Sequence, residues 1–135
     1  SAGLTPTSQN WTVTRNIVVA KSDEEARQFA REGSLGQCLE YILELTRRTA
    51  PNGVDLWKPS PDMSDEDLNM DYFMDEIVIA GTPETVTKQL LGLRETVGEF
   101  GNITLVAHCW DDKEKWMTTY ELFANEVLPA VNSAL

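Results

Sequence analysis

The chain has 135 residues, a length that suits one domain, and its 41% hydrophobic content is ordinary for a globular protein. Twenty-two acidic residues against 11 basic ones give a net charge of −11, which disfavours non-specific binding to nucleic acid or anionic lipid. No apolar run approaches the roughly 20 residues needed to span a bilayer, so we expect neither a nucleic-acid partner nor a membrane partner.

The first ten residues are expected to be an extension, in which Ser1-Ala2 resembles the remnant of an expression tag. The segment Trp11–Ala20 is rich in β-branched residues and ends in a continuous apolar run, which predicts a strand covered on both faces. Ser22 and Glu25 then form a capping box, which predicts a helix from about Asp23 to Arg31.

Gly33–Gly36 interrupts that helix, and the apolar spacing after it predicts a second helix that ends at the Pro51-Asn52-Gly53 turn. Residues of about 50–70 contain several prolines and are expected to form a loop. Within this stretch, Ser64 is expected to start a short acidic helix that reaches Phe73 or Met74.

Ile77–Ala80 predicts a second buried strand, and Thr82 with Pro83 marks the start of a helix that Gly98 closes. A third strand is expected at Ile103–Ala107. The acidic run Asp111–Glu114 then opens a last helix, which Pro129 is expected to end or kink.

Repeated strand–helix units predict an α/β fold with parallel strands joined by right-handed crossovers, in which strands that are consecutive in the chain are neighbours in the sheet. Three such units in residues 11–135 are too few for a closed barrel, so the pattern is typical of a piece of a larger fold. Cys38 and Cys109 lie far apart, each within an apolar segment. We expect two buried, reduced thiols, no metal site and a cytoplasmic location.

Several motifs between Trp11 and Val131, taken in order, resemble the luciferase-like flavin monooxygenases, in particular the limonene-monooxygenase-like branch. They are Arg15–Ala20 followed by Ser22–Ala26, Gly33–Gly36, Gly81–Glu84, Leu90–Gly98, Ile103–Ala107 and Glu126–Pro129. In that family, Gly81–Glu84 corresponds to a helix start that follows a strand, and Glu126–Pro129 to the close of the last helix.

The resemblance implies a partial (β/α)8 barrel, in which this chain carries the last three strand–helix units. Members of the family use reduced FMN, usually supplied by a separate flavin reductase, to insert one oxygen atom from O2 into a small organic substrate. Most of the loops that hold FMN in the family follow earlier strands. The chain alone is therefore expected to bind no FMN and to be inactive.

In (β/α)8 barrels the chemistry lies where strands end, which makes His108 and Thr82 candidates in this chain. His108 could serve as a proton shuttle near flavin or substrate, or could pair structurally with a neighbouring aspartate. Thr82 could help to bind the cofactor, or could only cap its helix. Trp57 and Lys58 lie in the 50–70 loop, which could be a lid over the substrate or a solvated linker.

Two other functions stay open at this stage. The chain could be a non-catalytic α/β assembly or binding module derived from barrel units. A small acidic hydrolase is a weaker alternative, since no nucleophile–base pair is identifiable. A homo-oligomer is also expected, because three strands cut from a barrel leave two edges and uncover the apolar faces of Val18, Val78, Ile79 and Leu105.

Overall fold

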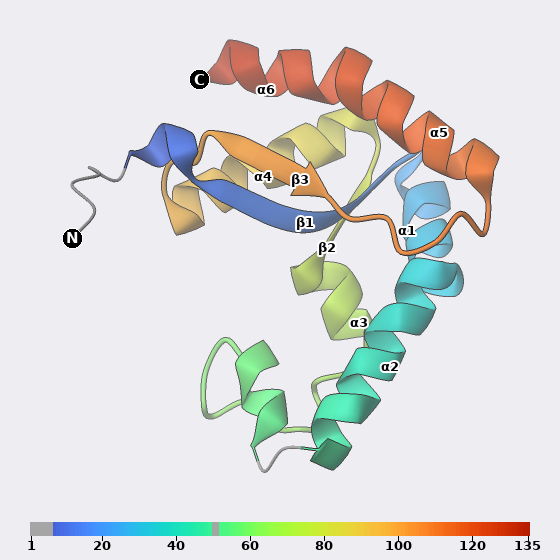
Figure 1. Cartoon of the computed structure of the whole chain (residues 1–135), viewed down its shortest axis with the longest axis vertical. Coiled ribbons are helices and arrows are strands. Elements are labelled where there is room, and N and C mark those ends of the chain that lie inside the picture. Colours follow the sequence, from blue (N-terminus) through green and yellow to red (C-terminus); the bar gives the residue numbers. More distant parts are fainter. Residues whose placement is uncertain (1–6, 50–51) are drawn as a thin grey trace.

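The computed structural model describes residues 7–49 and 52–135 (Figure 1). The expected tag residues Ser1-Ala2 and the first two residues of the expected 50–70 loop lie outside this range. A short 3-10 turn, η1 (Ser8–Asn10), is exposed and precedes the first strand.

In the described ranges, three parallel strands form one sheet: β1 (Thr12–Val19), β2 (Val78–Gly81) and β3 (Asn102–Leu105). The expectation of parallel strands in one sheet is confirmed. Their order is β2-β1-β3, so the expectation that chain order would also make β2 and β3 neighbours is wrong. β1 is long enough to pair with both strands. β2 pairs with the carboxyl half of β1, with Val78 opposite Asn16, and β3 pairs with its amino half.

The longer helices begin and end within a few residues of the expected positions. They are α1 (Asp23–Glu32), α2 (Ser34–Thr49), α4 (Pro83–Val97), α5 (Lys113–Leu122) and α6 (Leu128–Ala134). Two expected capping side chains accept a hydrogen bond from the backbone N–H three residues later: Ser22 for α1 and Thr82 for α4. For α5 the cap is Asp112, one residue after the expected Asp111.

Two cores cover the two faces of the sheet. On one face, Val18 and Val78 pack with α1, α2 and the buried Trp116 of α5; on the other, Ile17 and Ile79 pack with α4 and the end of the last helix. A right-handed crossover places its helix according to the direction in which the chain moves. The first crossover leads from β1 to β2 on one side of it, and the second leads from β2 back past β1 to β3 on the other side. Because these two crossovers run in opposite directions, α1 and α4 lie on opposite faces of the sheet (Figure 1).

This arrangement corrects the expectation of uncovered apolar faces. Val18, Val78 and Ile79 are 1%, 2% and 8% exposed within the single chain, and Leu105 is half-buried. The helices of the chain therefore cover the surface that a severed barrel was expected to leave open.

The segment between α2 and β2 is more ordered than the expected loop. It contains the 3-10 helix η2 (Gly53–Trp57), the short helix α3 (Met70–Tyr72) and the π-turn η3 (Phe73–Ile77). The expected acidic helix does not start at Ser64: the Ser64 hydroxyl exchanges hydrogen bonds with the side chain and the N–H of Asp67, but the chain forms only a turn there. Asn69 caps α3 instead, accepting from the N–H groups of Asp71 and Tyr72.

Pro129 does not end the last helix. A π-turn, η4 (Phe123–Val127), joins α5 to α6, and the N–H of Leu128 donates to the carbonyl of Phe123. Proline lacks an N–H and crowds the carbonyl four residues before it, so a widened turn just upstream accommodates it.

The expectation of two buried thiols is also wrong for one of them. Cys38 is half-buried on α2, but Cys109 is exposed, because β3 ends at Leu105 and the chain leaves the sheet sooner than expected. No helix within 7–49 or 52–135 has both the length and the apolar character to cross a membrane.

A buried hydroxyl completes the edge of β1 where β3 stops. β3 pairs only as far as Arg15, yet Val19 lies four residues further along the same edge. Thr119 of α5, fully buried, accepts from the N–H of Val19 at 3.3 Å and donates to its carbonyl at 3.1 Å. One side chain thus satisfies two backbone groups that would otherwise be buried without partners.

We predict that Thr119→Val lowers the free energy of unfolding by about 2–4 kcal/mol, since the near-isosteric side chain leaves both groups of Val19 unpaired. Urea unfolding followed by circular dichroism measures this change. Thr118→Val is the matched control, because the Thr118 hydroxyl donates only within its own helix, to Glu114. Equal effects of the two substitutions would contradict this role for Thr119.

Candidate functional site

The carboxyl ends of β1 and β2 are joined by one carboxylate. Asp23, the first residue of α1, accepts from the Thr82 N–H at 2.7 Å and from the Thr85 hydroxyl at 3.1 Å. These hydrogen bonds, from the Thr82 backbone first and Thr85 second, lower the pKa of Asp23. Gly81 permits this approach, because a Cβ there would come within 2.6 Å of the Asp23 carboxylate.

The start of α4 is therefore already occupied by a negative charge of the chain. The N–H of Thr82 is taken by Asp23, and Pro83 has no N–H to offer. A phosphate approaching this helix start would meet the Asp23 carboxylate. The contribution of Thr82 to cofactor binding stays a prediction, and its observed role is that of a helix cap.

A second carboxylate, in the connection between β3 and α5, binds this connection to α2 and α5. Asp111 accepts from the Ser34 N–H at 2.6 Å, from the Ser34 hydroxyl at 2.9 Å and from the Trp116 indole at 2.9 Å. Partial desolvation raises the pKa of Asp111, but the hydrogen bonds from Trp116 and Ser34 outweigh it and lower the pKa to about 2. Asp111 thus joins the start of α2 to the start of α5.

His108 lies in the same connection but does not bind either neighbouring aspartate. Its Nε2 is 3.1 Å from Oδ1 of Asn16, in the middle of β1. The structure therefore brings Thr82 and the Ser22-Asp23 corner together, whereas the hydrogen bond of His108 is made six residues before Ser22 in β1. A role for His108 in proton transfer stays a prediction.

Trp57 and Lys58 are both fastened to the rest of the segment around them. The Trp57 ring packs edge-to-face on Phe73, 5.3 Å between centroids, and its carbonyl accepts from the Tyr72 hydroxyl. The Lys58 ammonium lies 2.5 Å from Asp65 and 3.0 Å from Asp55, and these two carboxylates, Asp65 first, raise the pKa of Lys58. A motion of Trp57 or Lys58 relative to this segment would have to break these contacts, whereas a motion of the segment as a whole would keep them.

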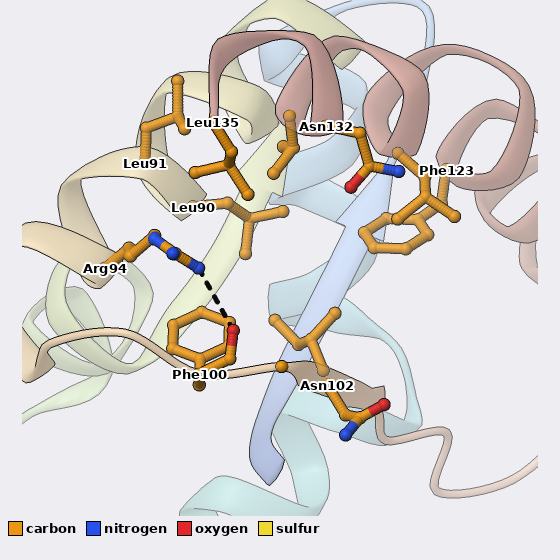
Figure 2. A pocket seen from close by; sticks show the side chains of 12 residues that line it. Leu90, Leu91, Arg94, Phe100, Asn102, Phe123, Asn132 and Leu135 are labelled. Carbon is orange, nitrogen blue, oxygen red and sulfur yellow. Dashed lines mark hydrogen bonds between the residues drawn. The ribbon is translucent and has the colours of Figure 1, made fainter. Parts of the chain in front are cut away.

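An apolar cavity of about 280 Å³ lies at the other end of the sheet, beside the amino end of β3 (Figure 2). Leucines 90, 91, 128 and 135 line it, and the guanidinium of Arg94, also at its wall, donates to the carbonyl of Phe100. None of His108, Thr82, Trp57 and Lys58 lines this cavity. In barrels that end of the sheet serves stability, whereas reactions take place at the carboxyl ends of the strands.

At the carboxyl edge, the start of α4, where Thr82 was expected to contribute to cofactor binding, is filled by the Asp23 carboxylate. The hollow lined by Val19, Phe29 and Thr119 has about 30 Å³, far below the roughly 300 Å³ of a small-molecule site.

Sequence reasoning missed two residues that organise this edge, Asp23 and Asp111, and a third in the middle of β1, Asn16. Asp23 and Asp111 were visible as acidic residues near helix starts, but their partners are 59 and 77 positions away in the chain. Asn16 gave little signal, because Thr12, Thr14 and Arg15 make the first half of the strand polar as well.

The chain is similar over nearly its whole length to several monooxygenases, although no family model matches it. It is 30% identical to 3,6-diketocamphane 1,6-monooxygenase of Pseudomonas putida, over 96% of this chain and 34% of that protein. It is 27% identical to limonene 1,2-monooxygenase of Rhodococcus erythropolis, over 98% of this chain and 32% of that protein.

One solved structure extends this similarity to the fold. The oxygenating constituent of 3,6-diketocamphane monooxygenase from Pseudomonas putida, a type II Baeyer–Villiger monooxygenase in complex with FMN, matches with a TM-score of 0.83 at 30% identity. The match covers 96% of this chain and 36% of that one, so this chain spans about a third of the length of these relatives. The expected α/β fold, with parallel βα units of a partial barrel, is confirmed.

We predict that Asp111 makes the stability of the chain pH-dependent in acid. Its pKa is about 2 in the folded chain and 3.8 for an ordinary aspartate, so the unfolded state binds the proton more tightly. The stabilisation is therefore present above pH 3.8 and is lost as the pH falls toward 2.

Urea unfolding of the wild-type chain and of Asp111→Asn at several pH values tests this. The wild type should be the more stable near neutral pH, and the difference should shrink in acid. Asp62→Asn, a change at an exposed aspartate, should show no such convergence. A wild-type advantage over Asp111→Asn that stays constant down to about pH 2.5 would contradict the assignment.

Proposed function

We propose that this chain, whose homologues are luciferase-like flavin monooxygenases, is one part of an enzyme of that kind. The whole enzyme would insert one oxygen atom from O2 into a small organic substrate, and FMN, when bound, supplies the activation of O2. One observation carries the proposal: the match covers 96% of this chain but only 36% of the FMN-containing structure.

In this proposal the chain supplies the part of the barrel that follows the main cofactor-binding loops. The remaining two thirds would hold most of the FMN, which agrees with the absence of a fitting phosphate position beside Asp23. His108 would face the reactants from the connection after β3. The segment that contains Trp57 and Lys58 would cover the substrate.

The proposal extends to the partners and the location of the protein. A separate reductase would supply reduced FMN, as in the family that the sequence resembles. Cys38 and Cys109 are both free thiols, which fits a reducing compartment, and we propose the cytoplasm.

A non-catalytic α/β module is the second candidate, and one observation favours it. The chain covers both faces of its own sheet, with Val18 and Val78 at 1% and 2% exposure, as an independently folded module would. Flavin binding by a completed barrel separates the two candidates.

We predict that a chimera regains flavin binding. Replacing the matching third of the P. putida 3,6-diketocamphane enzyme by this chain should give a protein that binds FMN and consumes O2 with reduced flavin and substrate. The isolated chain should leave FMN fluorescence unchanged in the same titration. A chimera that melts cooperatively yet neither binds FMN nor consumes O2 would favour the non-catalytic module.

In the same chimera, His108→Ala should lower turnover by about 100-fold if the imidazole moves a proton in the reaction, with the melting temperature retained. Cys109→Ala, a neighbouring substitution at an exposed position, is the control. Unchanged turnover in His108→Ala would assign His108 a structural role only.

We also propose that the isolated chain self-associates through its edge strands, β2 and β3. Since the apolar faces are already covered, backbone pairing at these edges is the main driving force that remains. Sedimentation equilibrium at micromolar concentration should give a mass above 15.1 kDa, and Thr104→Glu on β3 should reduce association by adding charge to a chain that already carries −11. A single 15.1 kDa species for the wild-type chain would rule this out.

A further inference from the structure

The ring of His108 is held by one hydrogen bond to the central strand. Its Nε2 lies 3.1 Å from Oδ1 of Asn16, and both side chains are half-buried. Asn16 belongs to the same face of β1 as Val18 and Ala20, which are buried in the first core. On that face Asn16 follows the exposed Thr12 and Thr14 and precedes the buried residues, and its observed partner is the one histidine of the sequence.

The chemistry of the pair fixes where the proton lies. An amide oxygen has lone pairs and no hydrogen, so Asn16 Oδ1 only accepts. Nε2 of His108 must therefore carry the hydrogen and donate it. In the neutral ring this leaves Nδ1 as the nitrogen with a free lone pair.

The surrounding backbone holds both partners in place. Asn16 pairs with Val78 of β2, while the preceding residue, Arg15, accepts at its carbonyl from the N–H of Val106, two residues before His108. Three residues after His108, Asp111 is fastened to Ser34 and Trp116. These anchors hold the backbone on both sides of His108 beside β1.

We propose that Asn16 is a positioning residue that holds His108 as the Nε2–H tautomer, so that Nδ1 is the ring atom that accepts a proton or hydrogen bond from the reactants. This rests on the proposed function for its purpose, because the reactants are those of the proposed monooxygenase. The tautomer itself is a property of this chain and does not depend on that function.

Nitrogen-15 NMR of the full 135-residue chain tests the proposal directly, since a single histidine gives one set of ring signals. At a pH where the ring is neutral, Nε2 should show the shift of a protonated nitrogen and Nδ1 that of an unprotonated one. The Nε2-bound hydrogen should also exchange slowly enough with water to be observed. A protonated Nδ1 in the wild-type chain would overturn the proposal without any variant.

Asn16→Ala removes the acceptor, and it should abolish the signal of the Nε2-bound hydrogen and bring the two nitrogen shifts closer together. Asn16→Asp keeps an acceptor at the same distance along the side chain and should retain the wild-type pattern. Asn102→Ala is the matched control, because the Asn102 amide donates to the carbonyl of Gln9 instead. An unchanged His108 spectrum in Asn16→Ala would also overturn the proposal.

The two proposals fail separately. Flavin titration of the chimera tests the monooxygenase assignment and does not depend on the His108 tautomer. In that chimera, Asn16→Ala should lower turnover and Asn16→Asp should restore part of it. Wild-type turnover in Asn16→Ala would show that the tautomer has no part in the reaction.

Discussion

The backbone of β1 requires hydrogen-bond partners along two edges and apolar cover on two faces, and most of the structure follows from that requirement. β2 satisfies the carboxyl half of one edge and β3 the amino half of the other. Where β3 ends, Thr119 supplies the missing donor and acceptor to Val19. The strand thus fixes the positions of α1, α4 and α5 around it, although these helices come from distant parts of the sequence.

Local signals in the sequence were sufficient for the strands, for the longer helices and for the caps Ser22 and Thr82, because such a cap acts within three residues. The order of the strands was not recoverable in this way, since an apolar run shows that a strand is buried but not which strand lies beside it. The same limit applies to the site. His108 was identified as a candidate from its place after a strand, whereas its partner Asn16 is 92 positions away.

The carboxyl edge of the sheet is built mainly from carboxylates that satisfy donors of the chain itself. Asp23 accepts a hydrogen bond from the start of α4, and Asp111 accepts from the start of α2 and from the Trp116 indole. Such side chains make the edge stable and acidic, which suits a scaffold for a neighbouring cofactor site better than a phosphate site. The imidazole of His108 makes its hydrogen bond in the middle of β1, away from these carboxylates.

The π-turn at Phe123–Val127 sets the rotational phase of the C-terminal helix. It acts as a one-residue insertion into a regular helix, and one residue corresponds to a rotation of about 100°. The widened turn absorbs that extra residue, so Phe123 at its start and Val127 and Val131 after it all pack on the second core. A deletion of one residue here would restore regular α-helical bonding and leave the last two turns facing the sheet, whereas the same deletion in the regular part of α5 would rotate everything that follows it by about 100°. The π-turn is therefore the place in this helix where the chain can change its length by one residue and keep its packing.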